Sequence, residues 1–217
     1  MAGIEDHFPP FGLRITCGPL ELRSVRETDT DEISALITGG IYDPNGYLPF
    51  LRRWAEAPAD LVPLQTMQFY WRTFAEFTPE SWHLVLAVRE QGRIVGVQDL
   101  VTKNFPITRS VETGSWLGRP FQGRGLGKLM RQAVCAFGFD ELGAEQMGSG
   151  YVEGNVRSAG VSRKVGYRPN GRIRTVHPDG DQVRIEERVV LTPDAFVRAP
   201  YALEVSGADE FRALIGL

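Results

Sequence analysis

The stretch "GRPFQGRGLGKLM", residues 118–130, decides how the rest of the chain is interpreted. Four of its thirteen residues are glycine and three are basic. Because glycine has no Cβ, the backbone of such a stretch can approach another group closely. From Leu126 to Phe137, apolar residues recur at helical spacing, which predicts one face of a helix that stops near Gly143. The glycines therefore precede a helix start. Three explanations are open: the backbone there approaches a nucleotide phosphate, it approaches another helix, or it only forms a tight turn.

The glycine spacing excludes two common nucleotide-binding motifs. In a phosphate-binding loop of the form G-x-x-x-x-G-K-[ST], Gln122 would occupy the first glycine position and Leu129 the hydroxyl position. In the dinucleotide fingerprint G-x-G-x-x-G, Gly123 and Gly125 fit, but Lys128 replaces the third glycine. The preceding chain also reads as a meander of strands and not as the opening of a βαβ unit. The motif that remains is Q-x-x-G-x-G at a helix start.

A helix start of this kind favours an anion. Its first N–H groups have no partner within the helix, and the helix dipole places positive charge there. No acidic residue interrupts residues 119–131. The pattern predicts an anion site, and the alternative is a glycine-rich turn that only lets the helix pack on a sheet. The basic residues around the site are Arg119, Arg124, Lys128 and Arg131.

The segments outward from the loop predict an α/β (α+β) fold. "WHLVLAVR" at 82–89 and "RIVGVQDLV" at 93–101 predict a hairpin, and "SVETGSWLG" at 110–118 predicts a third strand. The order of elements predicts a mixed, mostly antiparallel central sheet with flanking helices and one parallel crossover. The other expected elements are strands at 20–25, 144–152, 167–176 and 183–191, and helices at 28–38, 155–165 and 209–217.

The composition limits the classes of function. With 217 residues, 42% of them hydrophobic, the chain suits one globular domain, 1–217, with room for an insertion. Its net charge of −3 argues against nucleic acid as a partner and is compatible with amines. Cys17 and Cys135 lack metal-ligand spacing and the three histidines do not cluster, so we expect no metal and no disulfide. We find no apolar run of signal-peptide or membrane-span length, and we expect a soluble cytoplasmic protein.

The segment from 41 to 81 is dense in aromatic residues and follows no motif. Its second part, 64–77, reads as a helix that is apolar on several sides, which is typical of a buried helix or an interface. Two interpretations stay open. This helical insertion contributes core and dimer interface, or it forms a wall of a substrate pocket. The main apolar face of the expected helix consists of Leu64, Met67, Trp71 and Phe74.

Two linked segments resemble a known family. "SWLGRPFQGRGLGKLMRQAVCAFGFDEL" at 115–142 and "GYVEGNVRSAGVSRKVGYRPNG" at 150–171 follow each other as in the acyl-CoA core of the GNAT superfamily of N-acyltransferases. The branch that they resemble most is that of the ribosomal-protein N-terminal acetyltransferases. The resemblance covers residues 82–191 well and 13–40 loosely. It implies a GNAT-like fold in which a splayed pair of strands binds acyl-CoA.

The resemblance also implies where acyl-CoA binds. The pyrophosphate would lie on the N–H groups of the glycine loop, and residues 115–119 would pair with the pantetheine arm and hold the oxyanion of the intermediate. Asn155 would bond the arm or a water, and it also suits the N-cap of the helix that follows. The implied cofactor-binding residues are Trp116, Leu117, Gln122, Gly123, Arg124, Gly125, Leu126, Gly127, Lys128, Asn155, Ser158 and Arg163.

The chemistry implied by the resemblance is direct attack of an amine on the thioester. An ammonium with a pKa of about 10.4 must first lose a proton, so a base is needed. Glu112 is the candidate, and the alternative is an ordinary solvent-facing strand residue. Ser158 would protonate the leaving thiolate, although a thiol with a pKa of about 8.5 leaves with little help. Tyr167 matches a position that packs against the cofactor more often than it acts as an acid.

We therefore expect an N-acyltransferase that moves an acyl group, most simply acetyl, from acyl-CoA to a primary amine of a small molecule or a protein. Succinyl-CoA or another longer acyl-CoA is the alternative donor, and a carboxylated acyl group would need a basic residue such as Arg52, Arg53 or Arg72. A non-catalytic acyl-CoA-binding module is the alternative class of function. We expect no membrane partner and a homodimer or higher homo-oligomer.

Overall fold

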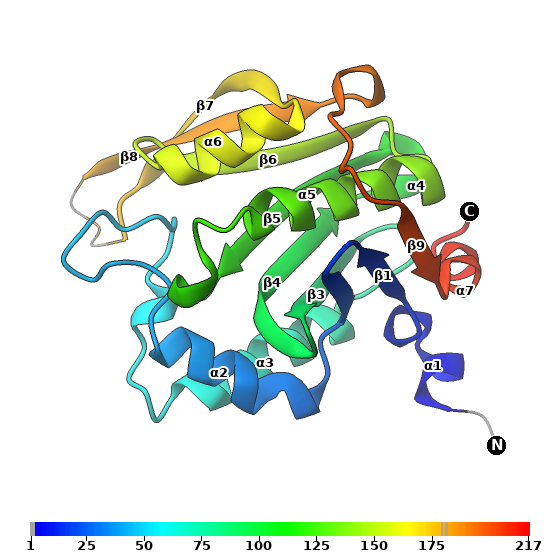
Figure 1. Cartoon of the computed structure of the whole chain (residues 1–217), viewed down its shortest axis with the longest axis horizontal. Helices are drawn as coiled ribbons and strands as arrows, with labels where there is room; N and C mark the ends of the chain where they lie inside the picture. The colour runs from blue at the N-terminus through cyan, green and yellow to red at the C-terminus, as the bar shows by residue number, and fades with distance from the viewer. Residues whose placement is uncertain (1–2, 179, 181) are drawn as a thin grey trace.

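The computed structural model describes residues 3–178, 180 and 182–217, and one nine-stranded sheet forms its centre (Figure 1). The strand order is β7-β8-β6-β5-β4-β3-β2-β1-β9. Neighbouring strands are antiparallel except β5 and β6, which are parallel. The strands are β1 (Arg14–Cys17), β2 (Leu20–Ser24), β3 (Trp82–Glu90), β4 (Arg93–Thr102), β5 (Ser110–Leu117), β6 (Gln146–Val152), β7 (Arg168–Val176), β8 (Val183–Leu191) and β9 (Leu203–Ser206).

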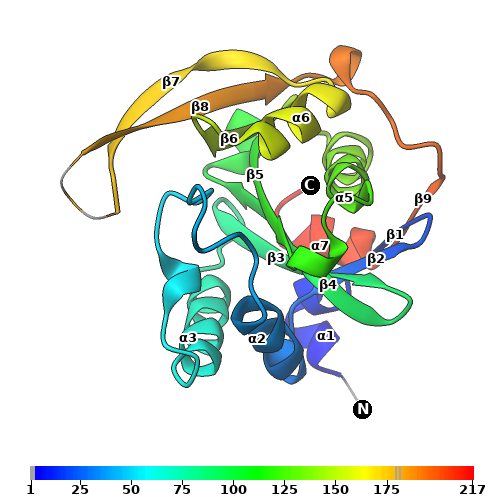
Figure 2. The ribbon, with the colours of Figure 1, turned by 60° about the vertical axis from the view of Figure 1, so that its left-hand side comes forward.

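Helices cover both faces of the sheet (Figure 2). On one face lie α2 (Thr30–Thr38) and α3 (Val62–Ala75), and on the other lie α5 (Leu126–Ala136) and α6 (Val156–Val165). The remaining helical elements are α1 (Ile4–His7), α4 (Phe105–Thr108), α7 (Ala208–Leu214), the 3-10 turns Pro9–Phe11, Glu27–Asp29, Trp54–Glu56, Arg119–Phe121 and Pro193–Ala195, and the π-helical turn Phe137–Glu141.

Two apolar cores lie on opposite sides of the sheet. The larger core joins the sheet to α5 and α7 and includes Phe137 and Phe211, both fully buried. The smaller core joins the sheet to α2 and α3 through residues such as Ile33 and Tyr70. The expected inner face of α5 is confirmed, because all its apolar residues from Leu126 onward are buried. This packing fixes the start of α5 against β5.

The sheet opens between β5 and β6. The two strands pair only from Ser110 with Gln146 to Thr113 with Ser149. Beyond that point, Gly114–Leu117 pairs with β4 and Gly150–Val152 pairs with β8, but the two segments do not pair with each other. We call the gap between these two segments the split. The splayed strand pair implied by the sequence resemblance is therefore confirmed.

The structure confirms the mostly antiparallel sheet, its parallel crossover and the order of the expected elements. Two short strands, β1 and the edge strand β9, were not predicted. Each has four residues, and they pair with each other, so neither carries enough alternation to be read locally.

The predicted face of α3 is wrong. Its buried residues are Val62, Thr66, Tyr70 and Thr73, whereas Leu64 and Trp71 are 52% and 45% exposed. The buried Thr73 hydroxyl donates to the carbonyl of Tyr70 at 2.8 Å, so the helix itself satisfies this polar group. Apolar spacing alone could not reveal that threonines form part of the inner face.

Candidate active site

The loop before α5 has the backbone that an anion site needs. Gly123 and Gly125 have φ values of 77° and 86°, a region that favours glycine. A Cβ at either position would meet no atom within 4 Å, so these glycines face open space. Gly125 is the N-cap of α5, which leaves the first N–H groups of the helix directed to that space. The other two glycines of the stretch fit the packing alternative. An added Cβ would lie 2.9 Å from a Leu36 atom at Gly118, and 3.6 Å from a Leu117 atom at Gly127.

Gln122 braces the loop. Its Nε2 donates to the carbonyls of Leu117 and Ile41, both at 2.8 Å, and its Oε1 accepts from Arg157 at 2.5 Å. The side chain therefore ties the end of β5 to the segment after α2 and to the first turn of α6. The sequence analysis predicted that Gln122 binds the cofactor. In the structure its side chain instead bonds to protein groups on both sides of the loop and holds the loop in position.

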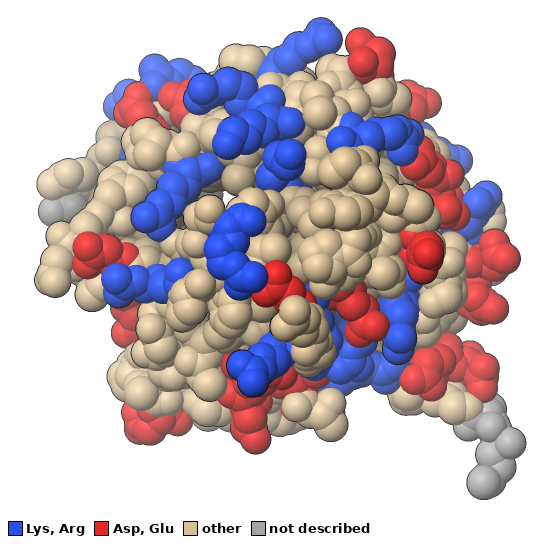
Figure 3. Space-filling view, in the orientation of Figure 1, with Lys and Arg blue, Asp and Glu red and all other residues tan. Residues whose placement is uncertain are grey.

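Basic residues surround the loop, and Figure 3 shows Lys and Arg side chains gathered over α6 and the start of α5. Arg119 and Arg124 are exposed, and Lys128 is half-buried. Arg124 also donates to Glu90 at 2.9 Å, so part of its charge is already balanced. Arg131 does not belong to this surface, because it is only 3% exposed and lies inside α5's packed face. The expectation that it adds charge to the loop is corrected.

Strand alternation places the predicted residues of β5 on two faces. Leu117 is buried towards α5, whereas Glu112 and Trp116 lie on the face of α2 and α3. Trp116 is half-buried and contacts Trp54, with ring centroids 5.8 Å apart. The ring of Trp116 is thus on the opposite side of the sheet from the glycine loop, with the split beside it.

Glu112 is part of an ion-paired cluster laid across β6. Its Oε2 accepts from Arg188 at 2.5 Å, and Arg188 also donates to Glu186 at 2.7 Å. Burial alone would lower the pKa of Arg188, but the two carboxylates more than offset this and raise it. A Cβ at Gly148 would lie 2.1 Å from Glu112 Oε1, and one at Gly150 would lie 2.0 Å from Glu186 Oε1. The two glycines therefore provide the surface on which this cluster lies.

The start of α6 lies beside the glycine loop. Asn155 is the N-cap of α6, because its Oδ1 accepts from the N–H of Ser158 at 3.1 Å. Its Nδ2 also donates to the carbonyl of Pro49 at 3.4 Å. Arg157 and Val161 form the side of α6 that meets the loop, which brings Ser158 near it. Arg163 is exposed and lies well round the helix from that side.

A glycine loop with open space before it, a split sheet and a carboxylate therefore lie along β5 and its continuation, and a family comparison decides the identity of the chain. A family model described as the acetyltransferase (GNAT) domain matches residues 20–168. The chain belongs to the GNAT acetyltransferase family. It is therefore an acyltransferase enzyme, and the alternative of a non-catalytic module is disfavoured.

Solved structures share the GNAT fold of this chain. Mycobacterium smegmatis RimJ in complex with CoA-disulfide is 17% identical with a TM-score of 0.71, covering 94% of each chain. RimL, a ribosomal L7/L12 alpha-N-protein acetyltransferase in complex with coenzyme A, is 16% identical with a TM-score of 0.63, covering 82% of this chain and 96% of that one. A chimera of Vibrio cholerae spermidine N-acetyltransferase SpeG and hSSAT is 15% identical with a TM-score of 0.62, covering 80% and 95%. The predicted resemblance is confirmed.

The segment that follows α2 in this GNAT chain crosses towards the split. The buried Arg184 of β8 donates to the carbonyls of Leu48 and Phe50. Tyr47 donates to the carbonyl of Glu153, and an aromatic row continues through Phe50 and Trp54 to Trp116. Sequence reasoning missed the role of Arg184, because nothing local marks an arginine that binds carbonyls more than 130 positions away. The first part of the aromatic segment therefore lies against β5, β6 and β8.

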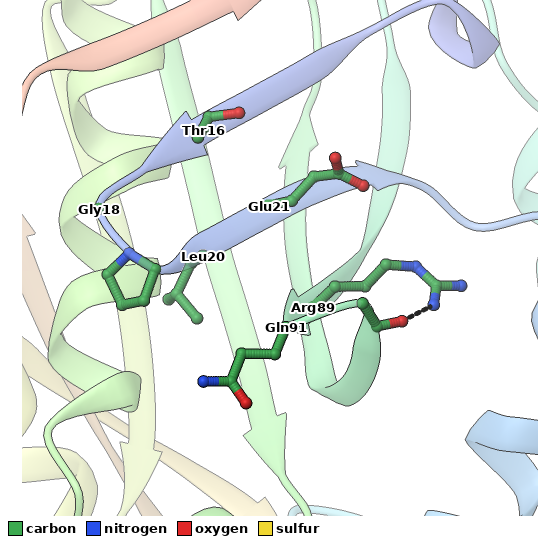
Figure 4. Close-up of a pocket in the computed structure, with 8 residues that line it drawn as sticks. Thr16, Gly18, Leu20, Glu21, Arg89 and Gln91 are labelled. Atoms are coloured by element: carbon green, nitrogen blue, oxygen red, sulfur yellow. Dashed lines mark hydrogen bonds between the residues drawn. The ribbon is translucent and has the colours of Figure 1, made fainter.

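A pocket of about 160 Å³ lies at the turns β1–β2 and β3–β4 of this GNAT fold (Figure 4). Two charged residues line it, and both already have partners. Glu21 pairs with Arg14 at 3.2 Å, and Arg89 donates to Asp29 at 2.6 Å and to the carbonyl of Gly92 at 2.8 Å. With those partners, Arg89 brings no free charge to the pocket. Within residues 3–178, 180 and 182–217, no group of three His, Cys, Asp or Glu could hold a metal ion, and no helix is long and apolar enough to cross a membrane.

Proposed function

We propose that this GNAT enzyme transfers an acyl group from acyl-CoA to a primary amine by direct attack. The observation that carries the proposal is the split, which opens beside the start of α5. An extended pantetheine arm can use the free edge of Gly114–Leu117 as an added strand, while the pyrophosphate occupies the glycine loop. The N–H groups of that edge would then face the thioester carbonyl and stabilise the oxyanion.

The charges on the α2 and α3 face support an amine as acceptor. Asp99, Glu112 and Glu186 all lie on this face, and the Asp99 carboxylate lies 3.6 Å from the position of a Cβ on Gly114. Arg188 and Arg184, which lie on the same face of β8, balance part of this charge, and His83 Nε2 lies 3.4 Å from Asp99. With three carboxylates against two guanidinium groups, an ammonium that approaches the split from this side would be attracted by one unbalanced negative charge.

Each predicted catalytic residue has a place in this scheme. Glu112 lies one position before Thr113, the last residue of β5 that pairs with β6. Its side chain is on the α2 and α3 face, where it would take the proton of the amine. Ser158 lies near the glycine loop on the donor side, where it would give a proton to the thiolate. Acetyl-CoA is the simplest donor and a longer acyl-CoA such as succinyl-CoA is the alternative.

The proposal extends to the whole chain. Residues 1–217 would act as one domain, with 41–81 as an insertion that shapes the acceptor side. The acceptor would be a small-molecule amine or a protein, and neither nucleic acid nor membrane is needed. The enzyme would act in the cytoplasm, and exposed apolar residues of α3 such as Leu64 and Trp71 favour a homodimer or higher homo-oligomer.

The test begins with calorimetric titration of coenzyme A and its acyl forms, followed by thiol release with a panel of amines. Glu112→Gln should lower kcat at least about tenfold while donor affinity is retained. Glu187→Gln is the matched control, because Glu187 is also paired with an arginine but lies on the other face of β8. If coenzyme A does not bind at high micromolar concentration, the proposal is wrong. If Glu112→Gln leaves kcat and its pH profile unchanged, the base is another group.

A further inference from the structure

Arg131 is a buried cation without an anionic partner. The side chain of this α5 residue is 3% exposed. Its Nη1 donates to Ser149 Oγ at 2.9 Å and its Nη2 donates to Ser115 Oγ at 3.0 Å. Its Nε is buried without an acceptor, and no carboxylate pairs with it in the part of the chain that the structure describes. A guanidinium has five N–H groups, so most of its donors are still available.

The groups around Arg131 do not balance its charge. The Tyr167 ring lies 5.8 Å from its guanidinium carbon, and the Tyr167 hydroxyl contacts Thr113 at 3.2 Å and Cys135 at 3.3 Å. Burial raises the pKa of both Tyr167 and Cys135, so these groups are neutral at neutral pH. Burying a charge with only neutral partners is costly, so an unmatched guanidinium is poised to bind an anion.

Arg131 lies at the closed end of the split. Ser149 belongs to the last paired position of β6, and Ser115 is the second residue of the free edge of β5. When the pyrophosphate is on the glycine loop and the arm follows the free edge, the acyl group comes closest to this end. A methyl group would be held best by apolar side chains. The groups present are instead hydroxyls and a guanidinium.

We propose that Arg131 binds a carboxylate at the far end of the acyl group, so that the donor is a short dicarboxylic acyl-CoA. A guanidinium binds a carboxylate through charge-assisted hydrogen bonds, which gain strength in a site shielded from water. This inference rests on the proposed function and names its donor class. The sequence suggested three other arginines for this carboxylate, and we do not assign the role to them because all three are exposed: Arg52, Arg53 and Arg72.

The test compares acyl groups that differ in the carboxylate. Calorimetry measures the affinities of coenzyme A, butyryl-CoA and succinyl-CoA, of which the two acyl forms have the same carbon number. We expect succinyl-CoA to bind the wild-type protein about tenfold or more tightly than butyryl-CoA. Arg131→Met should remove that preference while coenzyme A affinity changes less than about threefold, and Arg131→Lys should keep part of it.

The outcomes separate the inference from the proposed function. If coenzyme A does not bind, the proposed function fails. If coenzyme A binds but the wild-type protein prefers butyryl-CoA or shows no preference, the inference is overturned, and Arg131 only ties β5 to β6. The wild-type comparison does not depend on whether Arg131→Met folds. Where that variant folds, a preference for succinyl-CoA that survives in it also overturns the inference.

Discussion

Gly148 is the residue on which the position of Glu112 depends. Its missing Cβ leaves space for the Glu112 carboxylate, which would otherwise be 2.1 Å from that atom. We expect Gly148→Ala to displace the carboxylate and lower kcat about tenfold, with donor affinity changed less than about twofold. Initial rates and calorimetry measure the two quantities.

The control for Gly148→Ala is Gly12→Ala, at a position far along the chain from the split. There the new Cβ would lie 3.4 Å from its nearest atom, the Pro9 carbonyl oxygen, which is an ordinary contact. The Gly12 variant should keep the wild-type kcat. An unchanged kcat in Gly148→Ala would show that catalysis does not depend on the position of the Glu112 carboxylate.

Cys135 gives the fold a sensitivity to alkaline pH. Burial raises the pKa of its thiol from 9.0 to about 11, an effect that the Tyr167 hydroxyl and the Arg131 charge only partly oppose. A raised pKa favours the folded state at low pH, so this contribution is complete below about pH 9 and is lost as pH rises through 11. The loss amounts to about 3 kcal/mol.

Urea unfolding measured at intervals from pH 7 to 11 tests this sensitivity. Cys135→Ala should lower stability at pH 7, because it removes a buried group, and should flatten the alkaline decline. The raised pKa of Tyr167 acts in the same direction, so part of the decline should persist in the variant. A variant whose free energy of unfolding falls as steeply as that of the wild type would contradict the assignment to Cys135.

Single residues show how far sequence reasoning reaches. The glycine positions were predictable, because a motif fixes both residue type and backbone conformation. The ion pair of Glu112 with Arg188 and the burial of Arg131 were not. The ion pair joins residues 76 positions apart, and Arg131 bonds to Ser149, which is 18 positions away. Both contacts depend on how the strands are arranged in the sheet. No local signal marked Arg131, because it lies off the apolar face that the spacing predicts, and its polar neighbour Gln132 is also buried.

At the scale of elements, the start of α5 depends on a left-handed glycine. Gly125→Val forces a β-branched residue into φ 86° and puts a side chain in the open space where we propose that the pyrophosphate binds. We expect coenzyme A affinity to fall at least about tenfold, as measured by calorimetry. Gly143→Val carries the same kind of strain at φ 63°, also with no atom near the new Cβ, and lies beyond α5.

The Gly143 variant should lose stability but keep its affinity for coenzyme A, since only the backbone strain is shared. Equal affinities in the two variants would mean that strain, and not the loss of a phosphate site, explains any effect of Gly125→Val.

Arg184 of β8 makes two of the hydrogen bonds that hold the segment after α2. Arg184→Met removes the donor for the carbonyls of Leu48 and Phe50. We expect the segment to detach, which should raise the KM for the amine several-fold and leave donor affinity unchanged. Trypsin should also cleave faster after Arg52 and Arg53. Wild-type cleavage rates in the variant would show that other contacts hold the segment.

Elements with strong local periodicity were predicted well, and those without it were not. The start of α5 and strands β3, β4 and β5 follow clear patterns and were placed to within one or two residues. The α-helix itself ends at Ala136, before the expected stop near Gly143, because a π-helical turn forms Phe137–Glu141. The α3 helix was placed, but its inner face was wrong, because its buried threonines are polar. The segment between α2 and α3 has no period, and its course depends on contacts with β8 that only the fold creates.

At the scale of the whole molecule, the order of elements along the chain was enough to predict one mixed sheet with a parallel crossover. It was not enough to show that both ends of the chain meet at the same edge, where β9 joins β1. Pairing at that edge joins residues almost 200 positions apart, and such distant partners leave no local pattern.

The split also predicts the order in which the two substrates bind in the proposed reaction. Within the sheet, four parallel pairs join β6, β8 and β7 to the other strands, and the remaining links are side-chain contacts and the helices above them. A donor arm in the split would complete the sheet and align the strands on both sides of the gap. The surface that binds the amine would therefore be complete only after the donor has bound. We expect compulsory-order kinetics, with coenzyme A competitive against the donor and not against the amine. A random-order pattern would mean that the two halves are aligned before any donor arrives.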